Sequence, residues 1–137
     1  MKKYRITFVA LTIAALILEA LPYGAVCNFA TPEKTITETF SYFSLTPLGY
    51  ANSGPFLTAI MTCLLCIISI ILLIKTGKKL LKAAQVISVI SLVFSLFPLL
   101  FGLSYYNAVS FSVSLLMIVI IIVIIKIKKG VSHDETQ

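Results

Sequence analysis

The sequence has few of the side chains that enzymes use for catalysis. Its 137 residues include one histidine, His133, and only five acidic residues. A lone histidine near the C-terminus supplies neither a cluster of metal ligands nor a Ser/His/Asp set, and the six glycines form no phosphate-binding loop. The sequence therefore predicts a protein that is not an enzyme and that uses no metal and no cofactor.

Long polar segments are also scarce, because four apolar runs of 18 to 21 residues occupy most of the chain. Each run is close to the roughly 20 helical residues that cross the hydrocarbon core of a bilayer. The hydrophobic fraction of 59%, the charged fraction of 12% and the mean hydropathy of +1.05 lie outside the range of soluble domains. We therefore predict an all-α fold, a four-helix transmembrane bundle that forms one membrane domain over residues 1–137, with spans at about 6–26, 55–74, 83–103 and 108–125.

The basic side chains indicate how these spans are oriented. If the four helices alternate in direction, ten of the eleven basic residues lie on one side of the membrane and only Lys34 lies on the other. The positive-inside rule makes the first side cytoplasmic, so both termini are inside, residues 27–54 form an outer loop and residues 130–137 form a short disordered cytoplasmic tail. The ten residues are Lys2, Lys3, Arg5, Lys75, Lys78, Lys79, Lys82, Lys126, Lys128 and Lys129.

The same distribution decides what the positive charge means. The net charge of +6 is a topology signal that also meets anionic lipid headgroups, and it does not indicate nucleic-acid binding. The use of isoleucine and lysine is compatible with a bacterial source. We therefore expect a multi-pass protein of the bacterial plasma membrane whose partners are the lipid bilayer and either a membrane protein or further copies of the chain.

The first apolar run has an alternative reading as a cleaved secretory signal, because a basic start precedes an apolar stretch that ends near small residues. The run is long for a signal, Glu19 interrupts it, and the bulky Val26 precedes Cys27 in a poor version of a lipoprotein cleavage box. We therefore expect an uncleaved first span. Cleavage would leave three spans and place the new N-terminus outside.

Glu19 is the only acidic residue within the expected spans. At about 1.5 Å per residue it lies roughly 21 Å beyond Arg5, in the outer half of the membrane. Because no lysine or arginine is expected at that depth, the carboxyl must be protonated, solvated, bound to a cation or hydrogen-bonded to a polar neighbour. Both a proton or cation site and a structural hydrogen bond, for example to a serine of the third span, remain open.

Two prolines are expected to break the outward-running helices. Pro22 has no N–H for the carbonyl of Leu18, so the helix opens beside Glu19, and Pro98 lies in the corresponding part of the third run. The polar residues of that run are spaced by three, three and four positions, which places them on one face suited to close helix packing. They are Gln85, Ser88, Ser91 and Ser95, of which Ser91 and Ser95 would join Glu19 in a ligand site if this face meets the first helix.

The second run contains a C-x-x-C motif, Cys63 to Cys66. It begins about 12 Å past Pro55, inside the apolar run, where a thiolate is poorly stabilised and a regular helix resists disulfide geometry. We expect both cysteines to be small core residues. A membrane thiol oxidoreductase is the alternative.

The outer loop is unusually aromatic for a solvated connection. Its candidate interaction residues are Phe40, Tyr42, Phe43 and Tyr50. The segment from Thr35 to Glu38 has the form of a capping box, so we expect a short interfacial helix over about residues 36–43, ended by the turn at residues 46–49.

Two resemblances accompany these patterns. A glutamate in the first of four helices, in the setting Leu16-Ile-Leu-Glu-Ala20, resembles the small multidrug-resistance transporters, in which that acid binds protons and cationic drugs in turn. The segments at residues 21–26, 40–52 and 54–59 are similar to a group of small, uncharacterised bacterial four-span proteins, a resemblance that implies a fold and supplies no activity.

The leading functional hypothesis is a small membrane module that binds a partner or lipid through the outer loop and the helix surfaces. The first alternative is a proton-coupled small-molecule transporter that uses Glu19, and the second is a thiol oxidoreductase that uses Cys63 and Cys66.

Overall fold

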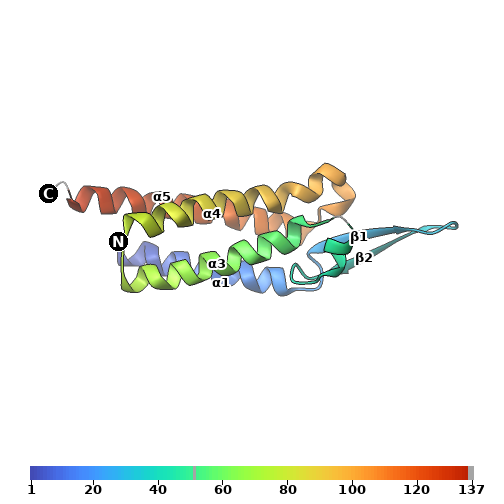
Figure 1. Cartoon of the computed structure of the whole chain (residues 1–137), viewed down its shortest axis with the longest axis horizontal. Coiled ribbons are helices and arrows are strands. Elements are labelled where there is room, and N and C mark those ends of the chain that lie inside the picture. The colour runs from blue at the N-terminus through green and yellow to red at the C-terminus, as the bar shows by residue number, and fades with distance from the viewer. Residues whose placement is uncertain (51, 136–137) are drawn as a thin grey trace.

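Four long helices make up most of the chain in a computed structural model, which describes residues 1–50 and 52–135. They lie side by side along the long axis of the molecule (Figure 1), and we refer to them together as the helical body. Helix α1 packs against α3 and α5, and α4 also packs against α3 and α5, so each helix has two helical neighbours. The four helices are α1 (Lys2–Ala20), α3 (Gly54–Ile74), α4 (Lys78–Leu96) and α5 (Ala108–Glu135).

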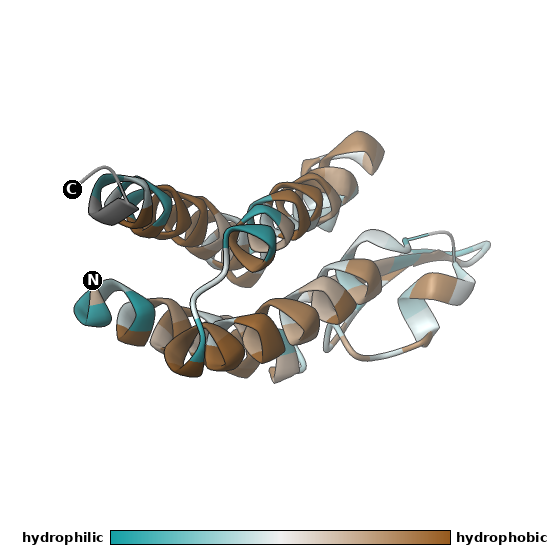
Figure 2. Cartoon of the chain, turned by 60° about the vertical axis from the view of Figure 1, so that its left-hand side comes forward, coloured by the Kyte–Doolittle hydropathy of each residue, from teal (hydrophilic) through white to brown (hydrophobic). Residues whose placement is uncertain are grey.

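Within the described residues, three helical segments are long and apolar enough to cross a membrane: Gly54–Ile74, Lys78–Phe101 and Ala108–His133. Helix α1 is not among them, and its 19 residues carry four charged side chains, three near the start and Glu19 near the end. Hydrophobic residues line the lengths of the helices, whereas hydrophilic residues gather where the two termini lie (Figure 2). These lengths and this patterning suggest a membrane protein, as the sequence predicts.

Large apolar side chains cover both the inside and the outside of the helical body. The buried core contains Phe8, Leu65, Leu81 and Met117 among others. Many residues of the same type face outward, as lipid-facing side chains do. Examples are Ile67, Val93, Phe111 and Ile122, each about half exposed or more.

Helix α1 ends well before the expected limit of the first span at residue 26. Its last residue is Ala20, and Leu21 follows with an extended backbone while its N–H bonds the carbonyl of Leu18 at 3.2 Å. The cause is Pro22, which disfavours the helical conformation in the residue before it and has no N–H to continue the hydrogen-bond pattern. The proline therefore terminates the helix, whereas we expected it only to disrupt the hydrogen bonding of a helix that continues to residue 26.

Pro98 has a milder effect on the third apolar run. Helix α4 ends at Leu96 and the chain continues as a 3₁₀ helix, η1 (Phe97–Phe101). The N–H of Phe97 bonds the carbonyl of Phe94, the group that Pro98 would have satisfied in a regular α-helix. A second 3₁₀ turn, η2 (Leu103–Tyr105), then leads into α5.

The segment expected to form the outer loop, residues 27–54, contains most of a β-hairpin where we expected an interfacial helix over residues 36–43. Strand β1 (Ala25–Ala30) pairs antiparallel with β2 (Thr35–Phe40), and Thr31 closes the turn by donating its N–H to the carbonyl of Lys34 at 2.9 Å. The helix prediction is wrong because β2 is rich in β-branched residues and finds a pairing partner in β1. The hairpin extends away from the helical body, at the end opposite to the termini (Figure 1).

Two further segments complete the description. A short helix, α2 (Thr46–Gly49), follows the hairpin at the position of the expected turn. Helix α5 continues to Glu135, so residues 130–135 of the expected disordered tail are helical, while residues 136 and 137 lie outside the described part of the chain. Lysine is a good helix former, so the lysines after residue 125 allow α5 to continue beyond the apolar run.

Candidate functional site

The carboxyl group of Glu19 lies inside the helical body, one residue before the end of α1. Its side chain is 0% exposed, and the hydroxyl of Thr62 on α3 donates to Glu19 Oε1 at 2.7 Å. Glu19 Oε2 has no hydrogen-bond partner among the described residues. The polar neighbour of Glu19 is thus a threonine of the second apolar run, whereas we had suggested a serine of the third.

Tyr42 lies beside the end of α1 and is also fully buried. Its backbone N–H donates to the carbonyl of Glu19 at 2.9 Å, which ties the chain after the hairpin to the end of the helix. The Tyr42 ring packs on Gly24, where an added Cβ would lie only 2.7 Å from a ring carbon. The phenol oxygen lies near the hydroxyl of Ser110 without a hydrogen bond of ordinary geometry, because Ser110 donates to the carbonyl of Gly24, and burial raises the pKa of Tyr42 above its ordinary value.

The serine stripe of α4 meets a different neighbour from Glu19. Ser95 Oγ lies 2.9 Å from Ser114 Oγ on α5, and Ser91 donates to the sulfur of Met117 at 3.4 Å. The hydroxyl of Tyr106 also donates to Ser114, at 2.7 Å. Ser91 and Ser95 are therefore packed into the α4–α5 contact, while Glu19 bonds α3, and within the described part of the chain no hydrogen bond joins these three candidate site residues.

The segment between α1 and β1 is held by polar side chains from distant parts of the chain. Ser110 donates to the carbonyl of Gly24 at 2.8 Å, and the side-chain amide of Asn107 donates to the carbonyl of Tyr23. Asn52 donates to the carbonyl of Val26 at 3.2 Å. Sequence reasoning missed these residues. Asn107 could have been recognised because Asn is a favoured N-cap residue. In the structure its side chain accepts the N–H of Ser110 at 3.0 Å, as an N-cap does.

The aromatic residues of the outer loop divide between the core and the surface. Tyr42 is buried and Phe40 packs partly buried against the core, so neither is available in the way we expected. Phe43 is 42% exposed and Tyr50 is 64% exposed. The ring of Tyr50 meets that of Phe29 edge to face with centroids 4.8 Å apart, which joins the hairpin to the chain that precedes α3.

The three cysteines are all free thiols. Cys63 and Cys66 are half-buried within the regular helix α3. Cys27 is buried in β1, and burial, together with the nearby negative charge of Glu38, raises the pKa of its thiol. Among the side chains that the structure describes, no three of His, Cys, Asp or Glu are grouped so that they could hold a metal ion.

No protein-family model, curated protein or solved structure matches this chain. What the protein does must therefore be inferred from its own residues and their arrangement.

Proposed function

We propose that the chain is a four-span membrane module of the plasma membrane whose outer β-hairpin binds a partner protein. In this proposal α1 also spans the membrane, in addition to the three longer apolar helical segments. Its 19 helical residues reach roughly 28 Å, close to the thickness of the hydrocarbon core of about 30 Å. Lys2, Lys3 and Arg5 then reach the headgroups at the end where the termini lie, and the positive-inside rule makes that end cytoplasmic.

The observation that carries this proposal is the exposure of the hairpin. Residues 35–39 of β2 are all exposed, on both faces of the strand. In the described part of the chain the sheet has two strands, and the start of β1 is covered by the helical body, so the outer edge of β2 is the one that offers backbone donors and acceptors to a further strand. Phe43 and Tyr50 add exposed aromatic surface beside it, and aromatic residues are enriched at protein interfaces.

A projecting two-stranded hairpin is marginally stable by itself, but this one has supports that fix it on the helical body. They are the buried Tyr42, the edge-to-face contact with Tyr50, and the hydrogen bonds that Asn52 and Ser110 make to the start of β1 and the residue before it. An exposed element held in one position is suited to recognition because little ordering entropy is lost on binding.

The test is purification from native membranes in a mild detergent, with a photo-crosslinking residue at Ile36. We expect one stoichiometric crosslinked partner, lost in Tyr50→Ser and kept in Leu100→Ser. Leu100 is the matched control because it is 78% exposed and lies on η1, which follows α4. Self-crosslinking would make a second copy of the chain the partner, and a hairpin that crosslinks to nothing would contradict the proposal.

A second candidate is a proton-coupled small-molecule transporter, and the geometry of Glu19 favours it. The single proton of the Thr62 hydroxyl cannot serve both of its close acceptors, Glu19 Oε1 at 2.7 Å and the carbonyl of Thr58 at 2.9 Å. If Glu19 carries a proton, it donates to Thr62 while Thr62 donates to Thr58, and both contacts are satisfied. The site thus accommodates a neutral acid, and gain and loss of that proton is the step that a transporter would use.

Proteoliposomes test this second candidate directly. With an imposed proton gradient and tetraphenylphosphonium as the cationic probe, a transporter gives uptake that disappears in Glu19→Gln and persists in Glu38→Gln. Glu38 is the control because it is an exposed acid on β2. Uptake that survives Glu19→Gln would remove the carboxyl from any transport mechanism.

A further inference from the structure

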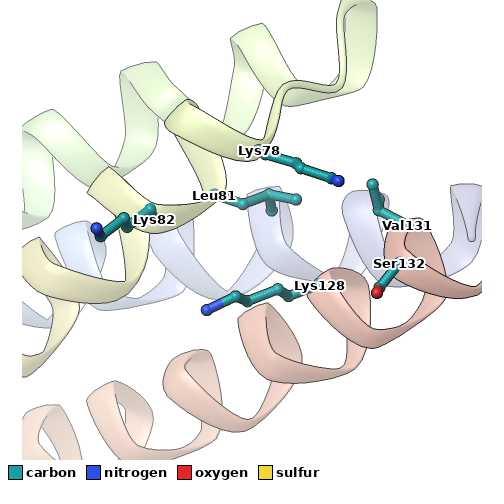
Figure 3. A pocket seen from close by; sticks show the side chains of 6 residues that line it. All are labelled: Lys78, Leu81, Lys82, Lys128, Val131 and Ser132. Carbon is teal, nitrogen blue, oxygen red and sulfur yellow. The ribbon is translucent and has the colours of Figure 1, made fainter. Parts of the chain in front are cut away.

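A cavity opens between α4 and α5 at the end of the helical body where the termini lie. Its volume is about 320 Å³, and Figure 3 shows the side chains around it. The amines of Lys82 and Lys128 come from the two facing helices and point to the same side, while Leu81 lies between the helices (Figure 3). The lining residues are Lys78, Leu81, Lys82, Lys128, Val131 and Ser132.

The cavity continues into an apolar groove along α4. A neighbouring hollow shares Lys82 and Lys128 with the cavity and extends over Val86, Val89 and Ile90. These three side chains are 50%, 45% and 38% exposed. From Lys82 to Ile90 the helix rises by about 12 Å, most of the roughly 15 Å that one leaflet contributes to the hydrocarbon core.

Polar and apolar groups are separated along this groove. Every ionisable side chain among the described residues that line the cavity and its neighbouring hollow is a lysine. Gln85 bridges the two helices, because its side-chain oxygen accepts a hydrogen bond from Lys128 Nζ at 3.1 Å. The amine of Lys128 is thereby held at the mouth of the groove, one helix across from Lys82.

We infer that this groove is a binding site for one anionic phospholipid of the inner leaflet. The headgroup phosphate lies between Lys82 and Lys128, and one acyl chain follows Val86, Val89 and Ile90 toward the membrane centre. Basic pockets between transmembrane helices on the cytoplasmic side bind such headgroups. The inference rests on the membrane orientation in the proposed function, but it does not depend on the hairpin or on Glu19.

The charge pattern favours this occupant over the other candidates. A soluble anion would use the lysines and leave the apolar groove empty, and a zwitterionic lipid would fill the groove without gaining from two cations. An anionic phospholipid matches both parts of the site. The groove also opens outward along exposed residues of α4, so a lipid can enter it from the side.

The test measures the preference for spin-labelled phosphatidylglycerol over spin-labelled phosphatidylcholine at the full-length protein in phosphatidylcholine vesicles. Electron paramagnetic resonance separates immobilised from mobile lipid. We expect a preference for phosphatidylglycerol that falls by roughly fivefold for each lysine replaced in Lys82→Gln and Lys128→Gln. The double change Lys82→Arg with Lys128→Arg retains charge and should keep the preference.

The matched control is Lys2→Gln with Lys3→Gln, which removes two charges at the same end without touching the groove. If this control loses as much preference for phosphatidylglycerol as Lys82→Gln with Lys128→Gln does, the preference comes from general surface charge and the proposed lipid site is wrong. Val89→Phe narrows the groove while both lysines remain. If the preference for phosphatidylglycerol is unchanged in that variant, the acyl chain does not bind along this groove and the inference is wrong. If glycerol phosphate displaces the labelled lipid, the lysines bind a free anion and the lipid assignment fails.

The variant Tyr50→Ser, which changes the residue packed against Phe29 of the hairpin, separates this inference from the partner-binding proposal. It should keep the lipid preference even if it loses its partner. If the protein crosslinks to its partner through the hairpin but shows no preference for phosphatidylglycerol, the lipid site is wrong and the partner-binding proposal stands.

Discussion

Replacing Glu19 by lysine should destabilise the protein strongly, whereas replacing it by glutamine should not. Glu19 is completely buried and bonds Thr62, and among the fully buried side chains that are described it is the only acidic or basic one. A lysine there buries a positive charge with no acidic partner, at a cost of about 3 kcal/mol on the membrane-insertion scale and more once the Thr62 contact is lost. That is a large part of a total stability of about 5–15 kcal/mol.

The glutamine variant keeps a neutral group of the same shape that can still bond Thr62, so its cost should stay within about 1 kcal/mol. The assay is thermal unfolding in lipid nanodiscs, followed by circular dichroism because the sequence has no tryptophan. Glu38→Lys is the control, since it makes the same change of charge at an exposed position of β2. Wild-type stability in Glu19→Lys would refute the reasoning, because it would mean that water or a partner already reaches the carboxyl.

Three further predictions follow from close contacts and from burial. Gly54→Ala should lower stability by about 1–3 kcal/mol, because the new Cβ would lie 2.6 Å from the carbonyl oxygen of Phe94, while Gly49→Ala, with nothing within 4 Å, should be neutral in the same thermal assay. Tyr42→Phe should change stability by less than about 1 kcal/mol, because the buried hydroxyl it removes makes no hydrogen bond of ordinary geometry and only lies near Ser110; a loss above about 2 kcal/mol would mean that the Ser110 contact is a full hydrogen bond. In a variant whose other two cysteines are serine, Cys27 should react with iodoacetamide at pH 8 more slowly than in the detergent-unfolded chain and gain rate as the pH rises, because its raised pKa leaves little thiolate; equal rates would contradict this.

The long apolar helices were predictable because the length of an apolar run alone indicates a helix that matches the thickness of the membrane. The second run was expected at residues 55–74 and α3 covers Gly54–Ile74, since no proline or charge interrupts it. The end of α1 was less predictable. Its apolar character continues past Pro22 to Val26, but the backbone cannot remain helical there, and residues 25–26 join a strand.

The hairpin was missed because the local signal and the tertiary signal disagree. Thr35 and Glu38 fit a helix start when read alone, but the pairing of β2 with β1 satisfies more backbone groups than a single capping box does. Thr37 also donates to Asn28 across the strands at 2.8 Å. Only the partner strand reveals this preference, and it lies several residues earlier in the sequence.

The partner of Glu19 carried a signal that we did not use. Thr58, Thr62 and Ser69 are spaced by four and seven residues, which places them on one face of α3, and all three are buried. Ser69 faces Thr12 of α1 with 3.3 Å between the hydroxyl oxygens, so this polar face marks the contact with α1. The serine stripe of α4 attracted attention first because it is longer, yet it marks the contact with α5.

The hydrogen bonds from Asn107 and Ser110 to Tyr23 and Gly24 join residues 84 and 86 positions apart. A chain that is synthesised from its N-terminus contains both acceptors early and both donors only when α5 begins. The base of the hairpin is therefore fixed only once α5 has begun, and a chain that stops before α5 would carry the hairpin sequence without these two hydrogen bonds. A partner that recognises the finished hairpin would thus distinguish a completely inserted protein from an incomplete one.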